Sequence, residues 1–367
     1  MAKIQFDESS SIHWLKVLGD RPVFLFPARI VGGHELMALE IIRSITSLGA
    51  DVKCLIEPSN TKLLSLLNNT QLPRSNIILL PFNQPRFEFL HSVLNYHLIK
   101  KAAEFLSEIS KVPHTEILFV QGDIEIGSTY VAAAIKANVF FMSYLPFTHS
   151  AKVMGKKLAI LRDYRNASLY KKVKRFATIS TIFKEQLYQL SPGCNVELIR
   201  NNTRDLYEFK LARKEKGATP NCDFFSIFII GRISYRQKGH DILLSAISKL
   251  DLRFRDVVEL NIIGDGEDAE DFRHRCKMLT PWLRTRFLGW QSEPWKDAHN
   301  ADLLVIPSRF EGVPLVMLEA LELGIPILSS NKDGMIEYLN KDDLFDNEQE
   351  LSTKIESILT VRVGSKI

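Results

Sequence analysis

The sequence predicts an α/β protein with two doubly wound, Rossmann-like parallel sheets facing each other across a cleft. Short apolar runs typical of buried strands alternate with segments of helical periodicity along the chain. The 367 residues, 46% hydrophobic and 25% charged, suffice for two cores. Apolar periodicity disappears where Lys, Arg, Glu, Gly and Pro dominate, which indicates a linker. We therefore expect a first domain at residues 1–205, a linker at 206–222, a second domain at 223–345 and a C-terminal helix and tail at 346–367.

The first half contains two strand patterns that lead into loops. Residues 22–27 form a buried-strand pattern, and the pair Gly32-Gly33 precedes a helical pattern that stops at Gly49. Glycine at a strand-to-helix turn lets the backbone approach a ligand, and a helix amino terminus favours anions. Residues 139–144 form another strand pattern, which is followed by a loop that carries His149.

The second half repeats this arrangement and adds two cations. The apolar run 224–230 ends in Gly231-Arg232, and a helical pattern begins near Lys238. Residues 258–263 and 286–290 also read as strands that end in glycine-containing turns. An Arg and a Lys at the edge of one loop can neutralise negative charge on a bound ligand without a metal.

The most informative segment carries two carboxylates eight positions apart. Residues 301–307 form a strand pattern, Glu311 follows in a loop, and Pro314 suits the first turn of a helix that contains Glu319 and ends at Gly324. Open parallel sheets bind ligands at the carboxyl ends of their strands. A carboxylate accepts hydrogen bonds from a vicinal diol, so the pair indicates a polyol-binding site.

This segment resembles the donor-site signature of the retaining glycosyltransferases of family four, which have the GT-B fold. The signature is Glu-Gly-x-Pro-Leu-x-x-x-Glu-Ala, with Glu311, Gly312, Pro314, Leu315, Glu319 and Ala320 at its fixed positions. The resemblance implies that Glu311 contacts hydroxyls of the transferred sugar and that Glu319 holds the ribose of the nucleotide. It also implies that backbone amides of Val313 and Leu315 lie near the sugar and the diphosphate.

The same resemblance assigns roles to residues elsewhere in the chain. Arg232 and Lys238 stand where the family carries two cations on the diphosphate. Gly32 and Gly33 match a Gly-Gly pair that in the family lies opposite the donor domain across the cleft. From the chemistry of such a loop we expect it to face the donor phosphates or the acceptor. His149 is the best match to a histidine that contacts the donor sugar and supports its developing positive charge. We expect no metal and no cofactor, because Arg232 and Lys238 supply the positive charge.

The implied activity is a retaining, metal-independent hexosyltransferase with a nucleotide sugar, UDP- or GDP-linked, as donor. The acceptor would be a glycan or a lipid-linked glycan, in bacterial cell-surface polysaccharide or lipopolysaccharide synthesis. Two alternatives stay open. One is a nucleotide-sugar epimerase of the same fold, and the other is a catalytically silent glycan-binding partner subunit.

Residues 152–175 hold nine cations and one acid, Asp163, and four apolar residues recur there at helical spacing. This basic segment is expected either to contact an anionic membrane or to pack its apolar stripe, Met154, Leu158, Leu161 and Tyr164, on the core. It lacks interleaved stacking aromatics and any recognisable nucleic-acid module, so no nucleic acid partner is expected.

The location is expected to be cytoplasmic, with contact at the inner face of the cell membrane. The amino terminus lacks the apolar core of a signal peptide, and no run of eighteen apolar residues exists. The four cysteines, Cys54, Cys194, Cys222 and Cys276, form no Cys-x-x-Cys pair, which is typical of reduced thiols.

Overall fold

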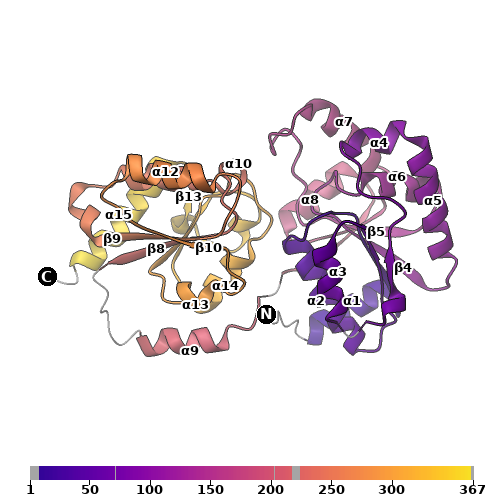
Figure 1. Cartoon of the computed structure of the whole chain (residues 1–367), viewed down its shortest axis with the longest axis horizontal. Helices are drawn as coiled ribbons and strands as arrows, with labels where there is room; N and C mark the ends of the chain where they lie inside the picture. The colour runs from indigo at the N-terminus through magenta and orange to yellow at the C-terminus, as the bar shows by residue number, and fades with distance from the viewer. Residues whose placement is uncertain (1–7, 71, 202, 217–223, 365–367) are drawn as a thin grey trace. The chain divides into compact units, whose positions relative to one another are not determined.

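The computed structural model describes residues 8–70, 72–201, 203–216 and 224–364. These residues form two compact units that divide between residues 202 and 203. Each unit contains one parallel sheet flanked by helices (Figure 1), so the predicted α/β architecture with two doubly wound sheets is confirmed. Cys222 and the linker residues 217–222 lie outside the described residues.

The N-terminal unit is built on a seven-stranded sheet with the order β3-β2-β1-β4-β5-β6-β7, in which neighbouring strands run parallel. The order reverses between β1 and β4, and ligands of such sheets bind at the carboxyl ends of the strands near a reversal. The strands are β1 (Arg21–Phe26), β2 (Lys53–Ile56), β3 (Ile77–Leu79), β4 (Thr115–Val120), β5 (Phe141–Tyr144), β6 (Arg175–Thr178) and β7 (Asn195–Leu198), and the helices are α1 (Glu8–Leu18), α2 (Gly33–Ser47), α3 (Thr61–Asn68), α4 (Glu88–Leu94), α5 (Tyr96–Ser110), α6 (Ser128–Lys136), α7 (Ala159–Tyr170) and α8 (Thr181–Leu190).

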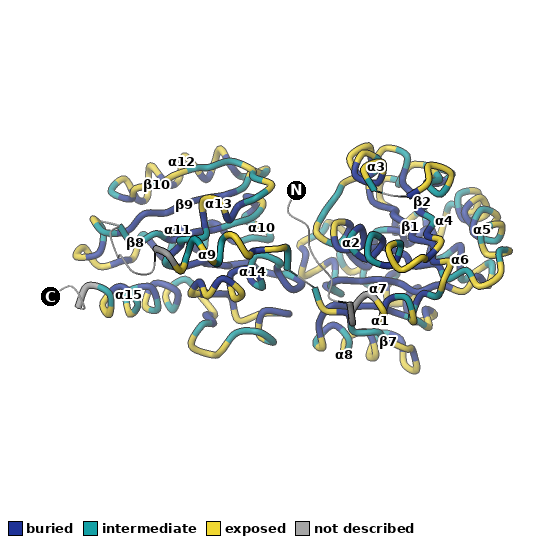
Figure 2. The backbone as a smooth tube through the Cα atoms, turned by 90° about the horizontal axis from the view of Figure 1, so that it is seen from below, coloured by how far each residue is buried: buried dark blue, intermediate teal, exposed yellow. Residues whose placement is uncertain are grey.

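The core of this unit follows from its apolar patterns. Residues 22–26 of β1 are buried, and α2 buries Leu39, Ile42 and Ile45 at helical spacing. Figure 2 shows β1 and β2 largely in the dark blue of buried residues. A continuous apolar strand covered on both faces is what a parallel sheet requires, which is why the strand patterns in this half were predictive.

The C-terminal unit has a six-stranded sheet with the order β10-β9-β8-β11-β12-β13, again parallel throughout its neighbouring pairs. Its order reverses between β8 and β11, so the loops after these two strands lie side by side. The strands are β8 (Phe225–Ile230), β9 (Val258–Ile263), β10 (Arg284–Gly289), β11 (Leu303–Ile306), β12 (Ile327–Ser330) and β13 (Leu344–Phe345), and the helices are α9 (Tyr207–Lys216), α10 (Tyr235–Lys238), α11 (His240–Ser248), α12 (Ala269–Leu279), α13 (Trp295–Ala298), α14 (Leu315–Leu323) and α15 (Glu348–Gly364).

Two helices define the ends of this unit. Residues 207–216, in the stretch expected to be a linker, form α9, and Arg213 anchors it by donating from Nη1 to the carbonyl oxygens of His299 and Ala301 at 2.9 and 3.0 Å. The predicted C-terminal helix is α15, whose Leu351 is fully buried in the core of the unit. Within the described part of the chain, every helix is too short or too polar to cross a bilayer.

Candidate functional site

The loops after β8 and β11 bring a lysine and a glutamate together at the carboxyl edge of the C-terminal sheet. Lys238 is the last residue of α10, and its Nζ lies 2.5 Å from Oε2 of Glu311. Both side chains are largely buried, at 21% and 13% exposed. The backbone N–H of Glu311 donates to Oδ2 of Asp333 at 2.9 Å, which fixes the loop. An ion pair held in this way places a cation and a sugar-binding carboxylate in one small volume.

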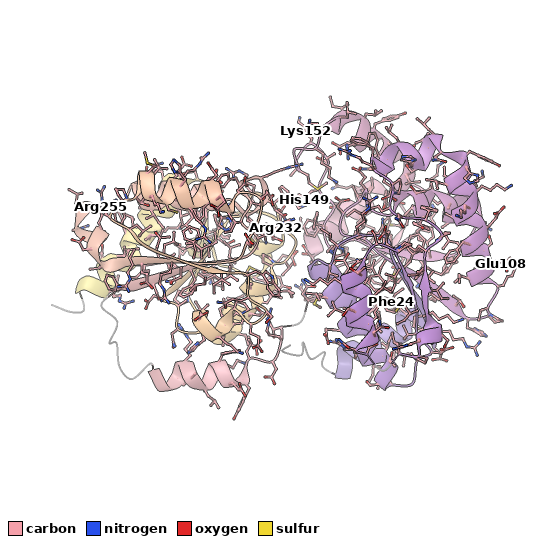
Figure 3. The ribbon with its side chains drawn as sticks, viewed as in Figure 1. Phe24, Glu108, His149, Lys152, Arg232 and Arg255 are labelled. Carbon is pink, nitrogen blue, oxygen red and sulfur yellow. The ribbon has the colours of Figure 1, made fainter. Side chains whose placement is uncertain are left out.

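Arg232 lies in the same loop as Lys238 and is exposed (Figure 3). Its Nη2 donates to Oε1 of Gln237 at 2.8 Å, one residue before Lys238. A Cβ placed on Gly231 would lie 3.6 Å from Cε of Lys238, so the backbone that carries Arg232 runs alongside the lysine chain. Lys238 and Glu311 are therefore brought together, and Arg232 is bonded to the residue beside Lys238.

Two glycines allow the backbone loops of this edge to touch. Gly264 has a φ of +151°, and a Cβ there would lie 1.9 Å from the carbonyl oxygen of Gly231. Gly239 has a φ of +66°, and a Cβ there would lie 2.0 Å from the carbonyl oxygen of Pro307. Only glycine fits such contacts. The contact at Gly264 joins the loop after β9 to the loop after β8, and the contact at Gly239 joins the start of α11 to the end of β11.

The helix after Glu311 begins and ends where the sequence predicts. Pro314 is the N-cap residue of α14, and Gly324 ends the helix in a left-handed conformation with a φ of +66°. Gly312, Val313 and Pro314 are buried, whereas Leu315, the first residue of α14, is half-buried. The predicted donor-site backbone is thus the short connection between Glu311 and a helix amino terminus.

Glu319 lies on α14 but is fully buried. Nε of Arg204 donates to its Oε1 at 2.5 Å, and Nε1 of Trp295 donates to its Oε2 at 2.7 Å. Burial raises the pKa of the Glu319 carboxyl, and the charge of Arg204 acts in the opposite direction. Arg204 also donates from Nη1 to the carbonyl oxygen of Ser292 at 2.9 Å. Both carboxylate oxygens therefore already have protein partners, which no motif in the sequence indicates.

In the N-terminal unit, Gly32 and Gly33 lie at the carboxyl end of β1, where α2 begins. The backbone N–H of Gly32 donates to Oε2 of Glu35 at 2.7 Å, and Nε2 of His34 lies 2.6 Å from Oε1 of the same carboxylate. Glu35 is fully buried. The glycine loop is thus held from inside by a carboxylate whose role the sequence patterns did not identify.

His149 follows β5, as the sequence predicts, and lies at the same edge of the sheet as the glycine loop. It is 9% exposed. Its ring packs between Phe147 and Phe183, with ring centroids 5.3 and 5.6 Å away. These aromatic neighbours fix the orientation of the imidazole.

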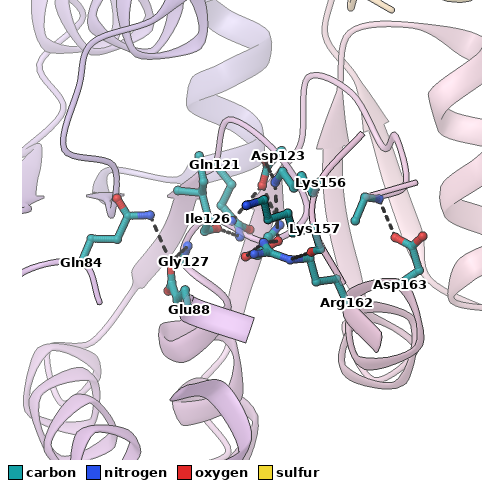
Figure 4. A network of polar contacts seen from close by, with 12 residues as sticks. Gln84, Glu88, Gln121, Asp123, Ile126, Gly127, Lys156, Lys157, Arg162 and Asp163 are labelled. Atoms are coloured by element: carbon teal, nitrogen blue, oxygen red, sulfur yellow. Dashed lines mark hydrogen bonds and ion pairs between the residues drawn. The ribbon is translucent and has the colours of Figure 1, made fainter. Parts of the chain in front are cut away.

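A polar network follows β4 at the neighbouring position of this edge (Figure 4). Lys156 Nζ lies 2.6 Å from Oδ2 of Asp123, and Nη1 of Arg162 lies 2.5 Å from Oε1 of Glu125. Although burial acts to raise it, the charge of Lys156 holds the pKa of Asp123 below its ordinary value. Lys156 and Arg162, two cations of the basic segment 152–175, therefore form ion pairs within the N-terminal unit.

Glu88 joins α4 to the amino terminus of α6 in the same region (Figure 4). Its carboxylate accepts the backbone N–H groups of Gly127 and Thr129 at 3.0 and 3.1 Å and the side-chain amide of Gln84 at 3.3 Å. Burial raises the pKa of Glu88 to about 7, and these donors oppose the rise.

We expect the contribution of Glu88 to the free energy of unfolding to fall as the pH rises from about 4.5 to 7, because folded Glu88 keeps a proton that the unfolded chain releases. A shift of this size corresponds to about 3 kcal/mol. Urea unfolding of the full chain and of Glu88→Gln across this pH range measures it. The difference between the two proteins should change across this range, and a constant difference would contradict the shift.

Comparison with known proteins places these observations in a family. Residues 212–363 match the family described as Glycosyl transferases group 1. The chain is 40% identical to the lipopolysaccharide 1,6-galactosyltransferase of Salmonella typhimurium over 118 residues, which are 30% of this chain and 32% of that protein. The alignment therefore spans about a third of the relative's length.

Two solved structures resemble the fold of the chain. Anabaena HepE, in complex with UDP and glucose, has a TM-score of 0.68 and 16% identity, covering 92% of this chain and 89% of HepE. The apo form of the lipopolysaccharide outer core galactosyltransferase WaaB has a TM-score of 0.68 and 17% identity, covering 94% of this chain and 91% of WaaB. The chain has the GT-B fold, and its residues 212–363 match the family described as Glycosyl transferases group 1.

Proposed function

We propose that the chain is a retaining, metal-independent glycosyltransferase. Its donor is a UDP- or GDP-linked hexose, and its acceptor is a glycan or lipid-linked glycan of bacterial cell-surface polysaccharide or lipopolysaccharide synthesis. The pairing of Lys238 with Glu311, next to Arg232, carries this proposal. It provides positive charge for a departing diphosphate beside a carboxylate for sugar hydroxyls. The name of the Salmonella relative and the UDP and glucose bound to HepE support the same substrate class.

In this proposal the donor replaces an interaction that exists in the free protein. Lys238 pairs with Glu311 before the donor binds. The diphosphate then takes the ammonium group of Lys238 together with Arg232, and Glu311 turns its oxygens to hydroxyls of the sugar. Negative charge that develops on the leaving oxygen meets cations already in place, which lowers the barrier without metal or cofactor.

The remaining steps need no protein nucleophile. The acceptor hydroxyl attacks from the face that the diphosphate leaves, and a phosphate oxygen of the leaving group takes its proton, so the anomeric configuration is retained. His149 supports the positive charge on the sugar ring. Gly32, Gly33 and the amides near Val313 and Leu315 approach the donor phosphates and sugar. NMR of the product made from a labelled donor separates retention from inversion, and transfer from epimerisation.

Glu319 is proposed to hold the ribose through lone pairs that Arg204 and Trp295 do not use. UDP or GDP should therefore raise the melting temperature of the full chain, because each binds the folded state. At a concentration about 100 times its dissociation constant, a nucleotide adds about 2.7 kcal/mol of stability. Differential scanning fluorimetry should show that Glu319→Ala loses most of this shift.

A matched control is Glu322→Ala. Glu322 is an exposed glutamate on the same helix, and its Oε1 lies 2.7 Å from Nζ of Lys210. This variant should keep the shift. An unchanged shift in Glu319→Ala would remove the ribose assignment. Absence of any shift with both nucleotides would overturn the proposed function.

A further inference from the structure

The first two turns of helix α7 bury polar side chains and expose apolar ones, whereas its last turn buries Leu169 and Tyr170. Arg162 and Asn166 are buried within the N-terminal unit. Ile160, Leu161 and Tyr164 are 84%, 49% and 76% exposed. The sequence alternatives for this segment included an apolar stripe packed on the core, and the structure contradicts that alternative for α7. Buried polar groups and exposed large apolar groups are the informative exceptions on a protein surface.

Helix α4 has the same reversed polarity. Glu88 and Ser92 are buried together with Phe89, whereas Leu90, Val93 and Leu94 are 36%, 52% and 75% exposed. Phe87, immediately before the helix, is 47% exposed. The buried carboxylate of Glu88 is bonded to the start of α6, so this orientation of α4 is fixed by hydrogen bonds.

The two helices lie side by side (Figure 1). Nη2 of Arg165 donates to the carbonyl oxygen of Ser92 at 2.7 Å, and the guanidinium of Arg162 lies 4.4 Å from the ring centroid of Phe89. These contacts join the helices through their buried faces and leave the apolar faces outward. We define the apolar patch as Phe87, Leu90, Val93, Leu94, Leu158, Ile160, Leu161 and Tyr164.

The exposed charges within the two segments that carry the apolar patch are positive. Arg86, Lys152 and Lys157 are exposed. The acids of the segments 86–97 and 152–168 are Glu88, which is buried, and Asp163, which is half-buried. The carboxylate of Asp163 accepts the backbone N–H groups of residues 151 and 152 at 2.5 and 3.2 Å. Apolar side chains with flanking cations match the interface of an anionic bilayer, where tails meet negative headgroups.

We propose that the apolar patch and its flanking cations form a peripheral docking surface for a bilayer that contains anionic lipid. A second copy of the chain is the other candidate occupant, but two copies of one positive surface repel each other in a symmetric dimer. The surface adjoins the carboxyl edge of the N-terminal sheet, because Lys156 reaches Asp123 after β4. Docking would therefore bring this edge close to lipid headgroups. The inference stands independently of the proposed sugar transfer.

The test is co-sedimentation of the full chain with vesicles of phosphatidylcholine alone or with about a third phosphatidylglycerol. The chain should bind the anionic vesicles, and salt should weaken the binding. One variant, Leu94→Ser with Ile160→Ser, removes an exposed apolar residue from each helix. A second, Lys152→Glu with Lys157→Glu, reverses the charge. Each variant should lower the partition coefficient of the chain between vesicles and water at least about tenfold. For the lysine variant this follows because each lysine near an anionic surface contributes about fivefold.

Matched controls lie in the C-terminal unit. Leu252→Ser with Val361→Ser changes two side chains that are 72% and 75% exposed, and Lys277→Glu with Lys341→Glu reverses two exposed lysines. Both controls should bind vesicles as the parent does, and the melting temperature of each variant checks its folding. The proposal fails if the parent ignores the anionic vesicles or binds both compositions equally. It also fails if ultracentrifugation shows self-association that Leu94→Ser with Ile160→Ser abolishes.

Discussion

Alanine in place of Lys238 is expected to lower the rate of UDP release from a UDP-hexose by about 10³-fold. The ammonium group of Lys238 is held 2.5 Å from Oε2 of Glu311, so it is already positioned when negative charge develops on the departing diphosphate. Its loss also leaves the Glu311 carboxylate without its cation. The measurement is the amount of UDP formed from UDP-galactose and UDP-glucose in quenched single-turnover samples, which separates the chemical step from product dissociation.

The control for this variant is Arg236→Ala, since Arg236 is an exposed cation on the same short helix, α10. It should change the rate by less than about threefold, in line with the small contribution of exposed charges. Lys238→Arg keeps the charge but changes the geometry, and an intermediate rate is expected. A Lys238→Ala protein that keeps more than about a tenth of the parent rate would contradict the assigned role.

Arg204→Ala is expected to lower the free energy of unfolding by about 3 kcal/mol at pH 8, because it leaves the buried Glu319 carboxylate without its ionic partner. The pKa of Glu319 is already raised by burial, and removal of the guanidinium raises it further. A carboxyl with a raised pKa loses stability as the pH rises above its ordinary value of 4.5. The loss caused by Arg204→Ala should therefore be largest above neutral pH and small near pH 4.5. Urea unfolding at several pH values measures it.

A double-mutant cycle isolates the pair from the other contacts of Arg204. Glu319→Gln removes the charge but keeps the shape of the side chain, so Arg204→Ala in that background should cost little and show no dependence on pH. Equal losses in both backgrounds would mean that the contact of Arg204 with Ser292 carries the stability.

The loop and helix around Glu311 were predictable because their signals are local. Pro314 and Gly324 mark the two ends of α14, and the apolar run before Glu311 marks β11. The carboxyl ends of neighbouring parallel strands then bring Lys238 to Glu311 across 73 residues of sequence. In sheets of this topology β8 and β11 are neighbours, so the loops that follow them meet. The contact between Lys238 and Glu311 could therefore be predicted from the local patterns of the two strands.

The partners of Glu319 were not predictable in the same way. Arg204 lies 115 residues away at the start of the unit, and Trp295 belongs to a four-residue helix that has no distinct periodicity. Neither residue stands in a recognisable motif. Which side chains satisfy a buried carboxylate depends on packing, and packing leaves no pattern in a single sequence.

The polarity of α7 shows a different limit. Periodicity correctly placed Leu158, Leu161 and Tyr164 near one another, but it identifies residues that share a face and not the direction in which the face points. Met154 was expected in the same helix, yet it lies in the turn before α7 and is buried. The buried pair of Arg162 and Glu125 decides the orientation. That pair depends on a loop of another strand, so local patterns did not reveal it.

The backbone contacts of Gly239 and Gly264 affect how genetic data on this protein should be read. A saturation library would lose function at both positions for every replacement, since any side chain would collide with a neighbouring carbonyl group. The same loss of function for every replacement is expected at a catalytic residue, so the two cases would be confused. Screens for the chemistry of this protein should therefore score soluble yield alongside turnover, so that steric intolerance is not counted as participation in the reaction.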